Sequence, residues 1–116
     1  MGKSILKDKS YSFAIRVVRL SQFMQTERKE FVLSKQVLRS GTATGALIRE
    51  AEFVQSKPYF THKMSIALKE ANETDYWLNI LKDTDYIGQN LFNSLQNDCN
   101  ELIAMLISSI KTAKKK

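Results

Sequence analysis

Apolar residues recur every three or four positions along almost the whole chain of 116 residues, and only three short polar segments interrupt this pattern. The spacing is typical of amphipathic helices, because one helical turn takes about 3.6 residues. The interruptions are the segments 26–29 (TERK), 55–58 (QSKP) and 82–86 (KDTDY). Connections this short force consecutive helices to lie antiparallel. The sequence therefore predicts an all-α fold, an antiparallel up-down-up-down four-helix bundle.

The first helix is expected over residues 11 to 26 and the second over residues 33 to about 55. The third is expected from Ser56 to about 82, and the fourth follows the 82–86 segment and ends at about 112. Ser10 is available as the N-cap of the first helix, and Ser56 can cap the third, with Pro58 in its first turn. The second and third helices would each be on the order of 38 Å long. We expect one domain over residues 1–116, with a core at about 8–112 and a basic tail at 113–116.

The second helix has a middle segment, residues 39–46 (RSGTATGA), that is poor in strong helix formers, so a kink or loop there is the alternative. The run from Gly41 to Gly45 lacks the Lys-Ser/Thr ending of a phosphate-binding loop. Its small residues instead favour close approach of another helix. Arg39 and Glu50, on either side, are either solvated or part of an ion network with Glu70 or Glu73.

Apolar positions at helical spacing in the first helix, Phe13, Val17, Val18 and Met24, predict its core face. In the fourth helix, Leu91, Leu95, Cys99 and further apolar residues do the same. Because Cys99 lies on this apolar face, we interpret it as core filling rather than as a nucleophile.

Catalytic and metal chemistry is not indicated by the residues present. The single histidine, His62, does not follow any Glu at the spacing that di-metal bundles use, and Glu70 with Glu73 is the nearest pattern. We therefore expect no enzyme activity, no metal and no cofactor. One cysteine, no secretory signal and no apolar run near 20 residues favour a cytoplasmic protein without a membrane-spanning segment.

The net charge of +6 is distributed unevenly. Residues 1–63 carry twelve Lys and Arg against five Asp and Glu, whereas residues 64–110 carry two against seven, and four more lysines follow. Such a division suits an anionic ligand on one face or head-to-tail contacts between subunits. An ordinary solvated surface is the simpler alternative.

Two long segments carry a family resemblance: residues 33–51 (LSKQVLRSGTATGALIREA) and residues 59–78 (YFTHKMSIALKEANETDYWL). They resemble the small bacterial four-helix-bundle proteins encoded in intervening sequences of 23S ribosomal RNA genes. That family is similar to the accessory variability determinant protein of diversity-generating retroelements, a five-fold ring that partners a reverse transcriptase and nucleic acid. The resemblance implies a homopentamer with RNA, DNA or a reverse transcriptase as partner. Leu47 stands where the family commonly has Asn, so a polar contact of the family is in question here.

Basic side chains of the first two helices are the candidates for contacts with a phosphate backbone, without reading of bases. Arg16 and Arg19, three residues apart, are expected to project together. Phe60 and Trp77 are interpreted as packing residues rather than as a platform for base stacking. The full set of nucleic-acid candidates is Arg16, Arg19, Lys35, Arg39, Arg49 and Lys63.

A second apolar stripe on the third helix, Ile66, Trp77 and Ile80, is the predicted oligomer interface, because one small bundle does not cover a helix on two sides. The function that follows is a non-enzymatic, homo-oligomeric protein that binds nucleic acid without sequence specificity. The alternative is a protein-only scaffold, or a reverse-transcriptase accessory subunit, that does not contact nucleic acid directly.

Overall fold

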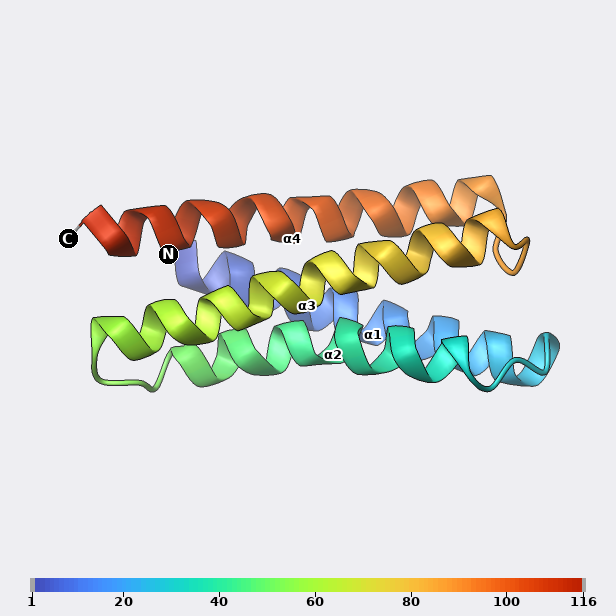
Figure 1. Cartoon of the computed structure of the whole chain (residues 1–116), viewed down its shortest axis with the longest axis horizontal. Coiled ribbons are helices and arrows are strands. Elements are labelled where there is room, and N and C mark those ends of the chain that lie inside the picture. The colour runs from blue at the N-terminus through green and yellow to red at the C-terminus, as the bar shows by residue number, and fades with distance from the viewer. Residues whose placement is uncertain (1, 116) are drawn as a thin grey trace.

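Four antiparallel helices make up the protein in a computed structural model that describes residues 2–115, with the side chains of 5–115 (Figure 1). They are α1 (Gly2–Glu27), α2 (Leu33–Ala51), α3 (Lys57–Asp83) and α4 (Gln89–Lys115). Each packs on the next in chain order, α1 also contacts α4 less extensively, and the bundle measures 47 × 20 × 20 Å. The predicted fold class, an up-down-up-down four-helix bundle, is confirmed. The last residue of the predicted basic tail, Lys116, lies outside the described residues.

The start of α3 follows the prediction. Ser56 has extended backbone angles, its Oγ accepts a hydrogen bond from the Tyr59 N–H at 3.3 Å, and Pro58 lies in the first turn. Serine oxygens satisfy the free N–H groups at a helix start, and proline there forfeits no hydrogen bond. Local chemistry alone therefore sets this boundary.

A carboxylate arranges the start of α2. The Glu30 side chain accepts hydrogen bonds from the backbone N–H groups of Val32, Leu33 and Ser34 at 3.2, 3.0 and 2.8 Å. Partial burial acts to raise the pKa of Glu30, but these backbone hydrogen bonds outweigh it and the pKa is lowered. In the turn between α1 and α2, Lys29 lies in the left-handed backbone region, with φ of 54°.

Three predicted helix boundaries are wrong. The first helix begins at Gly2 rather than at 11, so Ser10 is no N-cap but a buried residue whose hydroxyl donates to the Lys7 carbonyl at 2.9 Å. The apolar stripe extends back to buried Leu6, and this packing continues the helix. The second helix ends at Ala51, which makes it about 28 Å long, and the fourth runs on to Lys115.

The core runs the length of the bundle and includes Phe13, Val17, Met24 and Leu95 as predicted. Two predicted core positions are wrong, because Val18 and Leu91 are exposed. Cys99 is fully buried and its thiol donates to the Ala71 carbonyl at 3.3 Å, as expected of a filling residue. Burial raises the pKa of Cys99 to about 12.

The small residues of α2 form the contact with α1, and the helix continues through them without a break. A Cβ placed on Gly41 would lie 2.7 Å from Val17 Cγ1, and one on Gly45 would lie 3.3 Å from the Ser10 carbonyl oxygen. The prediction of close helix approach is confirmed.

Candidate nucleic-acid interface

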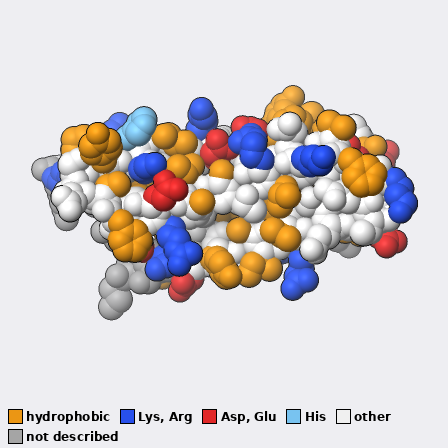
Figure 2. All heavy atoms as spheres, turned by 90° about the horizontal axis from the view of Figure 1, so that it is seen from below, with side chains coloured by type: hydrophobic (Ala, Val, Ile, Leu, Met, Phe, Trp, Pro, Cys, Tyr) orange, Lys and Arg blue, Asp and Glu red, His pale blue; other side chains and the backbone are white. Residues whose placement is uncertain are grey.

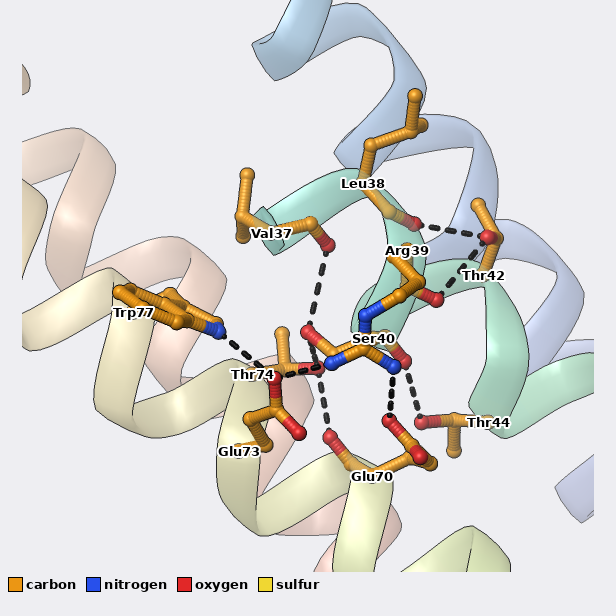
Figure 3. A network of polar contacts seen from close by, with 10 residues as sticks. All are labelled: Val37, Leu38, Arg39, Ser40, Thr42, Thr44, Glu70, Glu73, Thr74 and Trp77. Carbon is orange, nitrogen blue, oxygen red and sulfur yellow. Dashed lines mark hydrogen bonds and ion pairs between the residues drawn. The ribbon is translucent and has the colours of Figure 1, made fainter. Parts of the chain in front are cut away.

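A polar network joins α2 to α3 (Figure 3). The Arg39 guanidinium donates to Glu70 Oε1 at 3.0 Å and also to Glu73 Oε2, which accepts from Trp77 Nε1 at 3.0 Å as well. The Trp77 hydrogen bond, followed by that from Arg39, lowers the pKa of Glu73. Of the two alternatives for Arg39, the ion network is therefore the one present, and it engages the exposed guanidinium with carboxylates of the same chain.

Buried hydroxyl groups continue this network into the α2–α3 contact. The Ser40 and Thr74 hydroxyl oxygens lie 2.9 Å apart, and the Thr44 hydroxyl donates to the Ser40 carbonyl at 3.1 Å. Thr74 Oγ1 also lies 2.8 Å from the Glu70 carbonyl oxygen. These contacts tie the small-residue segment of α2 to α3 on the side away from α1 (Figure 3).

Two more of the predicted cations are engaged in ion pairs between helices. Arg16 reaches α4, where its Nη1 lies 2.6 Å from Asp98 Oδ2 and its Nη2 lies 3.0 Å from Ser94 Oγ. Lys63 on α3 binds Glu50 on α2 at 2.8 Å. Glu50 therefore pairs with Lys63 and does not join the Arg39 network.

The other three candidates, Arg19, Lys35 and Arg49, are exposed and make no ion pair with any described residue. Lys35 and Arg49 are two heptads apart on α2, so they lie on the same outward side of that helix. Arg19 projects from the adjacent helix α1. The structure thus separates three engaged cations from three that are free for an outside ligand.

An open groove of about 630 Å³ lies between α1 and α2, and we call it the α1–α2 groove. Lys7 and Tyr11 line it from α1, Thr42 and Arg49 line it from α2, and the small side chains around Gly45 leave room for it. The Lys7 ammonium lies 3.4 Å from a Glu52 carboxylate oxygen. Sequence reasoning missed Lys7 because the predicted first helix began at residue 11, and it gave no role to Tyr11, which that predicted helix included.

The outward side of α1 carries exposed apolar residues beside this groove. Tyr11, Ile15 and Val18 are 65, 41 and 37% exposed, and with Arg19 they line a shallow surface depression. Figure 2 shows hydrophobic side chains spread over this side of the bundle, along its lower edge and towards both ends, with Lys and Arg side chains between them. Tyr11, Ile15 and Val18 are spaced four and three residues apart, and this spacing in the sequence indicates a second apolar side on α1.

The predicted oligomer stripe lies partly within the protomer. Ile66, Trp77 and Ile80 are all half-buried, and Trp77 packs against the hydrophobic core. The Tyr76 ring meets the Trp77 ring edge-on at 5.2 Å between centroids. Phe60 also packs against the core, as predicted.

Among the side chains of residues 5–115, no group of three or more His, Cys, Asp or Glu is placed to hold a metal ion. Over the described residues, no helix combines the length and the low polarity that crossing a membrane requires.

Comparison with known proteins identifies a protein family and a similar solved structure. The sequence model of the 23S rRNA-intervening sequence protein family matches residues 3–108. The crystal structure of a protein with unknown function from the S23 ribosomal protein family of Bacteroides thetaiotaomicron VPI-5482 is 54% identical, with a TM-score of 0.94. That similarity covers 96% of this chain and 99% of the other. None of the curated protein sequences matches this chain.

Proposed function

This chain belongs to the 23S rRNA-intervening sequence protein family, and we propose that it is a non-enzymatic, homo-oligomeric protein that binds nucleic acid without sequence specificity. The observation that carries this proposal is the set of three exposed cations on α1 and α2, Arg19, Lys35 and Arg49, that have no carboxylate partner among the described residues. Cations that are not neutralised by neighbours attract phosphate and displace its counterions.

Contacts of this kind follow the phosphate backbone. Arg and Lys side chains on the outward sides of the antiparallel helices α1 and α2 meet phosphates, which are the same in every sequence. We therefore expect affinity that falls steeply as salt rises and changes little with base sequence. Ribosomal RNA or its gene is the nucleic acid that the family description suggests, and the cytoplasm is the compartment that this implies.

Self-association is the second part of the proposal, as a ring that we expect to be a pentamer. Five copies of a +6 chain carry +30, which strengthens attraction to a polyanion. Exposed Ile15 and Val18 on α1 and the half-buried stripe of Ile66, Trp77 and Ile80 are surfaces that a partner subunit would cover. Trp77→Glu should weaken assembly in light scattering at micromolar concentration, and a monomeric wild type would contradict the ring.

The binding test compares two triple variants that lose the same charge. Arg19→Gln, Lys35→Gln and Arg49→Gln together should reduce the slope of log affinity against log salt by about two to three. The matched control replaces the exposed lysines Lys29, Lys57 and Lys69 by Gln and should change the slope by less than one. Fluorescence anisotropy with labelled random RNA and DNA measures both. Equal slopes in the two variants would remove the α1–α2 face as the binding surface.

The division of charge along the chain favours one alternative, a scaffold that binds only protein, including a reverse transcriptase. Residues 64–110 carry a net charge of −5, which suits contacts with the basic half of another subunit. Under this alternative, wild-type protein would show no retention on heparin and no shift of RNA or DNA at low salt.

A further inference from the structure

We propose that the α1–α2 groove binds single-stranded nucleic acid, with one base stacked on Tyr11 and the adjoining phosphates held by Arg49 and Lys7. This rests on the proposed function and goes beyond it, because it names the form of the strand and the residue that selects it. The outward cations alone attract any polyanion, whereas a groove with an aromatic wall distinguishes an unpaired base from a paired one.

The groove exists because small residues meet where α1 and α2 are closest. A Cβ placed on Gly45 would lie 3.3 Å from the Ser10 carbonyl oxygen, so the two helices are close there, and Ala14 and Ala46 line the same region. Larger side chains stand on either side, so the surface is hollowed there to about 630 Å³. That volume lies within the range of about 300–1,000 Å³ that small-molecule sites occupy.

Tyr11 has the exposure that stacking requires. Its side chain is 65% exposed, and no hydrogen bond or ring contact within residues 5–115 holds it in place. The packing aromatics Phe60 and Trp77 lie against the core instead. Tyr11 is therefore the aromatic residue that combines a free ring face with a position inside the groove.

The cations are placed for the phosphates on either side of such a base. Among the side chains of residues 5–115, Arg49 is exposed and makes no ion pair, and Lys7 makes one, of 3.4 Å to Glu52. This pair is partly exposed and readily exchanged for a phosphate contact. Asp8 also lines the groove, is exposed and makes no ion pair with described residues. Its carboxylate opposes phosphate binding, so Asp8→Asn should tighten binding.

A duplex cannot use this arrangement. Its base faces are occupied by stacking on their neighbours, so Tyr11 would meet sugar and phosphate only. We therefore expect a labelled oligonucleotide of 20 thymidines or uridines to bind more tightly than a duplex of equal length at the same salt. Stacking on one aromatic residue contributes about tenfold in affinity.

The test is fluorescence anisotropy with these single strands and duplexes, using variants at two equally exposed tyrosines. Tyr11→Ala should weaken single-strand binding about tenfold without changing the salt slope or duplex affinity. Tyr11→Phe should restore it, because the ring is retained. Tyr59→Ala, at a tyrosine 66% exposed on α3 and outside the groove, is the control and should bind like the wild type. Arg49→Gln should instead lower the salt slope by about one.

Photo-crosslinking with 5-bromouracil in the single strand locates the contact independently, and Tyr11 should be the crosslinked residue. The inference is overturned if Tyr11→Ala matches Tyr59→Ala, if duplex binds as tightly as single strand, or if crosslinks map outside the groove. These outcomes leave the proposed function standing, since the wild type still binds. Failure of the wild type to bind either form would refute both.

Discussion

Replacing Gly41 by Ala tests how tightly α1 and α2 are packed, because the added Cβ would lie 2.7 and 2.8 Å from the two γ-carbons of Val17. Rotation of the Val17 side chain does not relieve this conflict, since its Cβ is only 3.1 Å away and the residue is fully buried. The helices must therefore separate by about 0.5 Å or more, and overpacking of this kind costs about 1–3 kcal/mol. The better helix propensity of Ala returns about 1 kcal/mol.

The expected result is a free energy of unfolding lower by up to about 2 kcal/mol for Gly41→Ala, measured by urea denaturation followed by circular dichroism at fixed protein concentration. Gly45→Ala is the matched control, because its Cβ would lie 3.3 Å from the Ser10 carbonyl oxygen and needs only a small shift. The propensity gain then roughly cancels the cost, and the change should stay within about 0.5 kcal/mol. Gly41→Ala as stable as Gly45→Ala would refute the reasoning.

Further predictions concern ion pairs, pH and the buried thiol. Arg16→Glu places a carboxylate beside Asp98 and should lower stability by about 1 kcal/mol in thermal denaturation. Arg19→Glu is the control and should change stability little, because Arg19 makes no ion pair with a described residue. Equal effects of the two substitutions would contradict the Arg16–Asp98 pairing. The lowered pKa of Glu73 stabilises the fold fully above the ordinary value of 4.5, and this contribution is lost as pH falls through the folded value, so urea midpoints should drop in acid and less so for Glu73→Gln. Cys99, with its raised pKa, should resist a thiol reagent at pH 8 until denaturant is added, and rapid native labelling would show an accessible thiol.

The sequence by itself determined the number, order and direction of the helices. Apolar periodicity reports which side of a helix is buried, and it needs no partner to be read. The cap at Ser56 and the close approach at Gly41 were also predictable from the sequence. A serine oxygen caps N–H groups next to it in the chain, and a glycine has no side chain to keep another helix away. The start of α1 was predicted wrongly from Ser10 as an N-cap, since burial of Leu6 in the core outweighed this local capping signal.

Which cations are free was decided only by the tertiary structure. Arg16 and Arg19 look alike in sequence, yet Arg16 meets Asp98, 82 residues away, and Arg19 makes no ion pair within the described residues. Arg39 is likewise engaged by Glu70, which is 31 residues distant and on another helix. The α1–α2 groove also depends on contact between two helices, because it places Tyr11 of α1 beside the small residues of α2. Side-chain pairing across helices depends on register and rotation between packed elements, and these follow from the whole core rather than from any one segment.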